Sequence, residues 1–215
     1  MLALGGSERI DLPDPDIGQS SPVPLFLTED APSRFTYLWY SSRSGPSGQS
    51  VDWSEKTTLD LEGPIDSADL PHWAELKDKA ITGLWRMKWT STMGVLENYC
   101  YETNDGLYFS YTKDLSWVTL VLPREISVGE SWVPYPGRPV GSGTCRVTRD
   151  DSLYIDLGSV EGLFRLVEIQ HGGFDTDYRD GWAVGLGLVY SVTKRVPGGL
   201  EVPVTNGTWL TDVEW

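Results

Sequence analysis

The stretch Tyr99-Cys100-Tyr101-Glu102-Thr103-Asn104-Asp105-Gly106-Leu107-Tyr108-Phe109-Ser110-Tyr111 decides the fold class of this chain. It contains two runs rich in aromatic residues, 99–103 and 107–111, on either side of the turn-forming segment 104–106. Aromatic side chains favour the pleated surface of a β-sheet. The Asp-Gly pair in the turn suits the left-handed backbone conformations of a tight hairpin. The stretch therefore predicts two antiparallel strands joined by a short turn.

A neighbouring segment, residues 84–90, assigns the two faces of another strand. Trp85, Met87 and Trp89 alternate with the charged Arg86 and Lys88. Because successive side chains of a strand point to opposite faces, this alternation predicts one aromatic face that is buried and one charged face in water.

Most of the chain repeats this pattern of short aromatic and β-branched runs between Gly, Asn, Asp and Pro turns. Further strands are predicted at residues 35–40, 56–62, 117–122, 146–155, 163–170, 184–195, 201–205 and 208–214. The polar segment 41–50 is predicted to be a loop, and Asn206-Gly207 is predicted to be the turn of a terminal hairpin. Frequent hairpins without crossover helices predict an all-β fold, a strongly curved antiparallel sheet that forms a half-barrel or barrel, with a sandwich as the remaining alternative.

One short helix is predicted within residues 69–77. Asp69 suits its N-cap and Pro71 its first turn. Four apolar residues follow helical spacing, namely Leu70, Trp73, Leu76 and Ala80.

Length and charge limit the domain organisation and the partners. A chain of 215 residues suits a single β-domain, which we place at 23–215, after a proline-punctuated N-terminal arm at 1–22 that is predicted to be flexible or extended. The 17 basic residues stand against 31 acidic residues, and the formal net charge is −14. Such a charge repels phosphate backbones, so nucleic acid is excluded as a partner.

The sequence holds no apolar run of the roughly 18 residues that a spanning helix needs, so no membrane-spanning segment is predicted. The segment Leu2-Ala3-Leu4-Gly5-Gly6-Ser7 is similar to the tail of a secretory or lipoprotein signal, but the basic segment and longer apolar stretch of a full signal are missing. Chance or a shortened start would each explain this likeness.

The chain has two cysteines, Cys100 within a predicted strand and Cys145 directly before the strand predicted at 146–155. They either form a disulfide bridge or remain as two unpaired thiols. Two cysteines alone do not complete a structural zinc site, and no cofactor is predicted.

Five segments in a consistent order resemble segments of bacterial envelope and secreted proteins of unknown function. These segments are Pro24-Leu25 with Phe35-Thr36-Tyr37, Asn104-Asp105-Gly106-Leu107-Tyr108, Leu122-Pro123 with Val128-Gly129-Glu130-Ser131-Trp132, Val160-Glu161-Gly162-Leu163-Phe164 with Leu166-Val167-Glu168-Ile169, and Trp182-Ala183-Val184-Gly185-Leu186-Gly187-Leu188-Val189. The resemblance spans roughly residues 24 to 195.

This resemblance implies a strongly curved sheet, a half-open barrel similar in outline to periplasmic lipoprotein carriers. It implies a periplasmic or secreted location and no known reaction. The chain departs from the pattern in lacking a convincing export signal and in holding the additional segment 66–79.

The tryptophans are candidate ligand-binding residues, because aromatic side chains line many concave sites for lipids, sugars and apolar peptides. The candidate set is Trp39, Trp85, Trp89, Trp117 and Trp182. The competing interpretation is that these indoles are ordinary core, since aromatic residues at alternate strand positions also build a β-sheet interior.

The segment 171–181 holds the densest group of polar residues. Asp175, Asp177 and Asp180 present carboxylates that could converge on calcium, although their spacing is not that of an EF-hand and Arg179 offers a counter-charge. The competing interpretation is a solvated hairpin tip.

Catalytic motifs are missing from the sequence, which has only two histidines and neither a Gly-x-Ser-x-Gly elbow nor a phosphate-binding loop. The sequence thus favours a non-enzymatic binding or structural component of an envelope or secreted assembly, with an apolar small molecule or a protein as partner. A protein assembly subunit that docks through residues 1–22 is the alternative. A glycoside hydrolase is the third hypothesis, which depends on the separation of two carboxylates in space.

Overall fold

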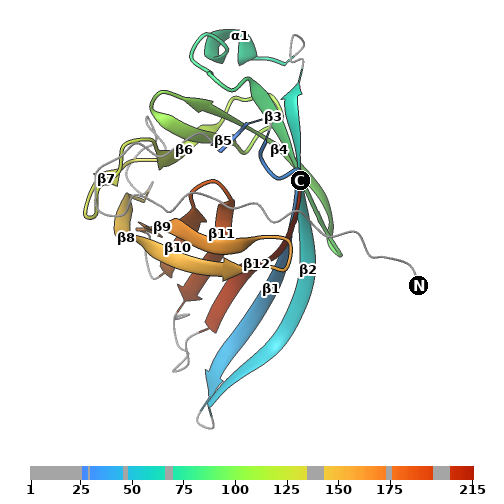
Figure 1. The fold of residues 1–215 in the computed structure, drawn as a ribbon, viewed down its shortest axis with the longest axis vertical. Helices are drawn as coiled ribbons and strands as arrows, with labels where there is room; N and C mark the ends of the chain where they lie inside the picture. The colour runs from blue at the N-terminus through green and yellow to red at the C-terminus, as the bar shows by residue number, and fades with distance from the viewer. Residues whose placement is uncertain are drawn as a thin grey trace.

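The computed structural model describes residues 26–28, 30–45, 48–65, 70–134, 143–172, 176–195 and 204–215, and it is almost entirely β-sheet (Figure 1). Its elements are β1 (Arg34–Gly45), β2 (Gly48–Ile65), α1 (Trp73–Leu76), β3 (Leu84–Ser91), β4 (Gly94–Thr103), β5 (Gly106–Ser110), β6 (Val118–Pro123), β7 (Ser131–Trp132), β8 (Cys145–Asp156), β9 (Glu161–His171), β10 (Thr176–Ala183), β11 (Gly187–Arg195) and β12 (Val204–Glu214). The predicted all-β fold class is confirmed. The arm proposed at 1–22 lies outside the described residues.

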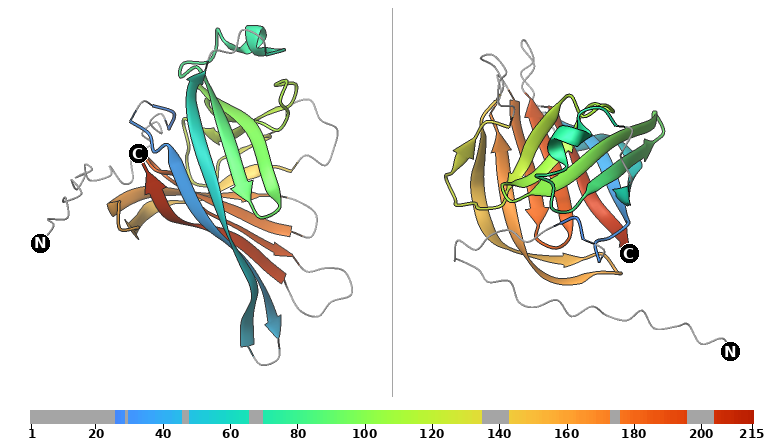
Figure 2. Two further views of the ribbon diagram at one scale, coloured as in Figure 1. Left: turned by 90° about the vertical axis from the view of Figure 1, so that its right-hand side faces the viewer. Right: turned by 90° about the horizontal axis from the view of Figure 1, so that it is seen from above.

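All twelve strands belong to one antiparallel sheet with the order β6-β5-β4-β3-β2-β1-β12-β11-β10-β9-β8-β7. Each strand therefore pairs with the next strand of the chain except at β6 and β7, and the last strand, β12, pairs with the first, β1. The sheet curls strongly around an interior, as the two views in Figure 2 show. The order is that of an up-and-down barrel that is left open between its two edge strands.

The gap between the edges is bridged by three hydrogen bonds between β6 and the segment 132–134, which holds the last residue of β7 and the two residues after it. Leu120 N–H and the Thr119 hydroxyl donate to the Pro134 carbonyl over 3.3 and 2.6 Å. The Trp132 indole N–H donates to the Leu120 carbonyl over 3.1 Å. These bonds satisfy groups of the edge strand β6 that would otherwise be exposed.

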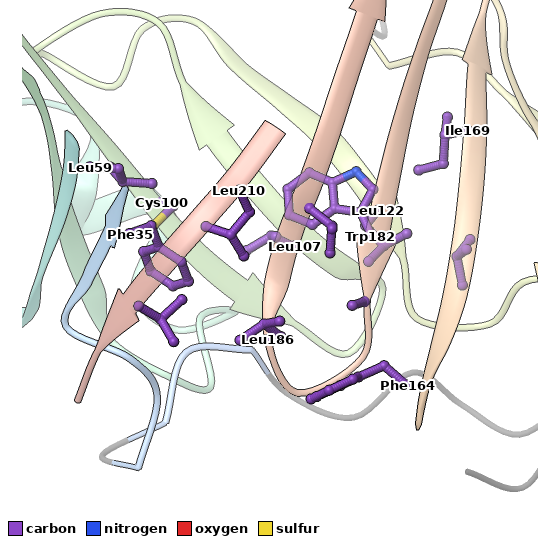
Figure 3. Packing of buried hydrophobic residues seen from close by; sticks show 14 of the residues in the cluster. Phe35, Leu59, Cys100, Leu107, Leu122, Phe164, Ile169, Trp182, Leu186 and Leu210 are labelled. Carbon is purple, nitrogen blue, oxygen red and sulfur yellow. The ribbon is translucent and has the colours of Figure 1, made fainter. Parts of the chain in front are cut away.

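The main core fills the inner side of the curled sheet. Figure 3 shows part of it, including Phe35 of β1, Leu107 of β5, Phe164 of β9, Trp182 of β10 and Leu210 of β12. Burial of each such side chain stabilises the fold by about 1.5–3 kcal/mol. Strands distant in the sequence are thus held together by one apolar cluster, and this cluster positions the candidate site.

The hairpin predicted around residues 104–106 is confirmed, with one difference in the turn. Thr103 pairs with Gly106 across the two-residue loop Asn104-Asp105. Of these residues only Gly106 has a positive φ, at 146°. A side chain there would place its Cβ 2.1 Å from the Leu122 carbonyl oxygen, so the glycine also permits β5 to approach β6.

The predicted helix is confirmed but begins later than expected. It starts at Trp73 with His72 as its N-cap residue, so Pro71 precedes the helix, and Asp69 lies outside the described residues. All four apolar residues predicted at helical spacing pack against a second, smaller cluster of Leu84, Tyr101 and Leu115. Within the described residues, the structure has no helix of the length and apolarity required to span a bilayer.

Two local predictions were wrong. The segment 41–50 is not a loop, because β1 continues to Gly45 and β2 begins at Gly48. Asn206-Gly207 is not a turn, because both residues lie inside β12 and pair with Ser41 and Tyr40 of β1. The alternation predicted for residues 84–90 is confirmed, since Trp85 and Met87 are buried and Lys88 is exposed.

Candidate functional site

The inner face of the sheet forms a trough with three hollows that share lining residues. Trp89 of β3 lines all three hollows. Met87, Phe109 and Trp182 line both the first and the third, and Leu96 lines both the second and the third. The inward side chains of β3 and β4 therefore run from a closed apolar end, through a central cavity, to an open end.

The closed end is a small apolar hollow of about 60 Å³. Phe26 and Leu27, which precede β1, line it together with the β10–β11 turn at Gly185 and Leu186. The Phe26 ring packs edge-on against the Trp182 indole with centroids 5.9 Å apart. The segment 26–28, which we call the strap, thus contributes apolar side chains to this end of the trough.

A buried carboxylate holds the strap in place. The backbone N–H groups of Phe26 and Leu27 donate to Glu102 Oε2 over 2.9 and 2.8 Å, and Arg124 Nη2 lies 3.5 Å from Glu102 Oε1. Burial raises the pKa of Glu102, and the hydrogen bonds from Leu27 and Phe26 and the charge of Arg124 oppose this rise.

The central cavity has a volume of about 340 Å³ and is mostly apolar. Ligand pockets of this type commonly measure about 300–1,000 Å³. Its walls come from two arms of the curled sheet, β3 to β6 on one side and β9 to β12 on the other. The lining side chains used below are Trp89, Asn98, His171, Tyr178, Asp180, Trp182 and Leu188.

Three buried polar atoms among these lining residues have no hydrogen-bond partner within the described part of the chain. They are Asn98 Oδ1, Asp180 Oδ1 and Trp182 Nε1. The three residues are only 8 %, 6 % and 4 % exposed. Leaving such a group unsatisfied costs about 1–3 kcal/mol each. None of the three atoms is accessible to a water-sized molecule, so they lie beneath the surface of the cavity.

The other atoms of two of these residues are firmly held. Asn98 Nδ2 donates to the Ser110 carbonyl over 3.0 Å. Asp180 Oδ2 lies 3.0 Å from His171 Nε2, and the ring of Tyr178 packs against the imidazole with centroids 4.5 Å apart. The unpartnered oxygens therefore have fixed positions.

A chain of three side chains runs from Cys145 of β8, which is not among the lining residues, to His171 of β9 and Asp180 of β10, which both line the cavity. Cys145 Sγ lies 3.2 Å from His171 Nδ1, and His171 Nε2 contacts Asp180. Burial, and then the charge of Asp180, raise the pKa of the Cys145 thiol to about 12. The thiol is therefore protonated at neutral pH, and its S–H can donate to Nδ1 while Nε2–H donates to Asp180.

This arrangement places a thiol, an imidazole and a carboxylate in the order used by thiol hydrolases. A nucleophilic cysteine, however, needs a lowered pKa and access to the substrate. Cys145 is buried with a raised pKa. Chemically, the chain of hydrogen bonds fixes the orientation of His171 and of the Asp180 carboxylate.

The open end of the trough is a hollow of about 400 Å³ lined by Trp39 and Trp89. The exposed apolar residues Met93, Val95 and Leu96 also line it, Met93 in the turn between β3 and β4 and the other two at the start of β4. Met93 is 88 % exposed.

The five candidate tryptophans occupy different places. Trp89 and Trp182 meet in the central cavity, and Trp39 lies at the open end. Trp85 is buried in the main core and donates its indole N–H to the Thr82 carbonyl, while the Trp117 ring packs against Tyr111. Ligand binding by these residues stays a prediction.

The calcium hypothesis also stays a prediction, because Asp175 and the side chain of Asp177 lie outside the described residues. Asp180 itself is not at a solvated tip, since it is buried on β10 beside His171. Among the described residues no group of three or more potential metal ligands converges on one point. Both cysteines are free thiols in the structure, Cys100 on β4 and Cys145 on β8.

Sequence reasoning missed Asn98, Cys145 and His171 as parts of the site. Asn98 offered one signal, because it stands between Leu96 and Cys100 at an inward strand position where an apolar residue is usual. No local pattern in the sequence indicates that Asn98 and Asp180 line one cavity, because β4 and β10 face each other only through the curvature of the whole sheet.

Comparison with known proteins gave one structural likeness. No family model matches the chain, and no curated protein matches it. Among solved structures, it is similar to a protein described as a "putative lipoprotein" from Parabacteroides distasonis ATCC 8503, with 9 % sequence identity and a TM-score of 0.37. That likeness covers 91 % of this chain and 100 % of the other.

Proposed function

We propose that this protein is a non-enzymatic binding protein that holds a small, largely apolar molecule in the trough of its curled sheet. The observation that supports this most directly is the central cavity of about 340 Å³, which combines a mostly apolar lining with a few polar side chains, among them Asn98, His171 and Asp180. Apolar walls with a few placed polar groups are the usual composition of a small-molecule site. An envelope or secreted assembly is the setting that we propose, on the basis of the resemblance in sequence.

The shape of the trough supports this proposal. An apolar tail would fit the closed end beside Phe26 and Leu186, and a polar group would lie in the central cavity. The open end, with Trp39 and Met93, would admit the ligand. Burial of an apolar ligand would contribute about 25 cal/mol per Å² of area removed from water.

Titration with the uncharged fluorescent dye N-phenylnaphthylamine tests the proposal. We expect saturable binding of one dye per chain by the wild type. Leu188→Trp adds bulk to a residue that lines both the closed end and the central cavity, and it should weaken binding at least about tenfold. Leu163→Trp makes the same substitution at an exposed position of β9 and should bind like the wild type.

Circular dichroism would establish that both variants fold. Dye binding that does not saturate in the wild type, or that survives unchanged in a folded Leu188→Trp variant, would contradict the proposal.

A further inference from the structure

The small hollow at the closed end is apolar space that the side chains of the protein leave unfilled. Its volume of about 60 Å³ exceeds the roughly 10–15 Å³ that one water molecule needs, and none of its described lining residues is charged. Well-packed protein interiors hold few voids larger than a water molecule. Apolar voids tend to stay dry and to take up apolar groups. The hollow is therefore suited to the end of an apolar chain.

This hollow adjoins the central cavity. The residues that line both are Met87, Trp89, Phe109, Trp182 and Leu188. The Trp182 ring packs edge-on against Phe26 and against Phe109, with centroids 5.9 and 6.0 Å apart. An apolar chain that begins in the central cavity and continues past these shared walls would thus reach the strap.

The strap lies between the closed end and solvent. Leu27 is buried and Phe26 is partly exposed, and both line the hollow. Leu186 of the β10–β11 turn, which is 2 % exposed, lines it as well. The tail of a ligand that enters from the central cavity would therefore meet the strap side chains at the end of its path.

The position of the strap depends on one carboxylate oxygen. Glu102 Oε2 accepts the backbone N–H groups of both Phe26 and Leu27, and the Glu102 side chain is only 2 % exposed. Glu102 lies beside Arg124, whose Nη2 also donates to the Thr103 carbonyl over 3.0 Å. Truncation of Glu102 would remove the acceptor of both strap amides at once.

We propose that the strap sets the greatest length of apolar chain that the trough accepts, with Phe26 and Leu27 ending the trough and Glu102 as their positioning residue. This inference rests on the proposed binding function and adds a length limit to its class of ligand. Each methylene that is buried raises the affinity about fourfold. A chain that already reaches the strap buries no further methylene there, so the affinity should stop rising at that length.

The test measures how straight-chain primary alcohols, from hexanol to tetradecanol, displace N-phenylnaphthylamine. For the wild type we expect the affinity to rise about fourfold with each methylene up to one chain length and to level off beyond it. Phe26→Ala leaves a cavity at the end of the hollow, so its affinities should level off at a chain longer by about two carbons or more. Wild-type affinities that rise through the whole series would overturn the inference.

Two further comparisons locate the effect. Phe164→Ala is the matched control, because Phe164 is a buried core residue that lines none of the three hollows, and it should leave the length limit unchanged. Glu102→Ala should lengthen the limit as Phe26→Ala does. Glu102→Gln keeps an oxygen for the two strap amides and should retain the limit of the wild type.

An unchanged limit in a folded Phe26→Ala variant, or an equal shift in Phe164→Ala, would overturn the inference. Saturable dye binding that Leu188→Trp weakens would still support the proposed function in that case. If Phe26→Ala does not fold, the smaller truncation Phe26→Val decides by the same criterion. A limit that moves equally in Glu102→Ala and Glu102→Gln, or in neither, would contradict the positioning role of Glu102.

Discussion

Gly207 of β12 lies directly opposite Tyr40 of β1, and the tyrosine ring covers the glycine. A Cβ atom at position 207 would lie 2.5 Å from Tyr40 Cε1, closer than real contacts allow. The same pairing recurs between Gly181 of β10 and Tyr190 of β11, where the added Cβ would lie 2.3 Å from the ring. At both places the aromatic ring supplies the packing that glycine lacks within a strand.

Gly207→Ala should therefore destabilise the protein by about 1–3 kcal/mol, because the added methyl group forces the Tyr40 ring out of its position. The measurement is the free energy of unfolding by urea. In a Tyr40→Ala background the space is free, so the same glycine substitution should cost much less or stabilise the strand. An equal cost in both backgrounds would mean that the ring does not set the requirement for glycine.

This pair also explains why Asn206-Gly207 was misread as a turn. The dipeptide is a strong local turn signal, but here the glycine is required by a ring on another strand, far away in the sequence. The prediction of a loop at 41–50 was wrong for a related reason. The strands β1 and β2 extend into this segment because they pair with each other there. The presence of the strands, and the alternation of side chains between the interior and the outer face, could be predicted. Both follow from local patterns such as Trp85-Arg86-Met87.

Glu102→Gln should change how stability depends on pH. Burial raises the pKa of Glu102 in the folded protein above the ordinary value of 4.5. The folded state then binds this proton more tightly than the unfolded chain does. The contribution of Glu102 to stability is therefore fully present below pH 4.5 and is lost as the pH rises through the raised pKa.

The side-chain amide of the Glu102→Gln variant cannot titrate, and its oxygen can still accept from the strap amides of Phe26 and Leu27, which both bond to one oxygen of Glu102. Relative to the wild type, we expect the unfolding free energy of this variant to improve as the pH is raised from about 4 to about 7. Urea titrations at several pH values measure this. A constant difference across that range would contradict a raised pKa at Glu102.

The state of the two cysteines can be measured with a thiol reagent in the absence of reductant. Burial raises the pKa of both thiols, with a further contribution from Glu102 at Cys100 and from Asp180 at Cys145. We expect neither thiol of the native protein to react readily, and both to react after denaturation. If the denatured chain shows no free thiol, the two cysteines form the disulfide bridge that the sequence left open.

The candidate site was less predictable than the fold. Trp89 and Trp182 could be named from the sequence because large aromatic residues are conspicuous at inward positions. Asn98 and Asp180 line the same cavity, although β4 and β10 are not neighbours in the sheet. The curvature of the strands between them brings the two residues to one place, and no local sequence pattern predicts this. For this reason the alternative interpretation of segment 171–181 as a solvated hairpin tip was wrong at Asp180, which is buried and lies beside His171.

A buried ion pair between β8 and β9 provides a further test of the sheet register. The Arg165 guanidinium of β9 donates to both oxygens of Asp150 of β8, over 2.9 and 2.8 Å. The side chains are 6 % and 17 % exposed, so water replaces little of the interaction if one partner is lost. Arg165→Met should cost about 3 kcal/mol in unfolding free energy, because it leaves the Asp150 carboxylate without its counter-charge.

Asp150→Leu in the Arg165→Met background should recover part of that loss, since a pair of apolar residues needs no counter-charge. Arg149→Met is the matched control, because Arg149 pairs with Asp151 at the surface, where both side chains are about half exposed. Its cost should be no more than about 1 kcal/mol. If Arg149→Met and Arg165→Met cost the same, the Arg165–Asp150 pair is as solvated as a surface pair, and the packing described for β8 and β9 would be wrong.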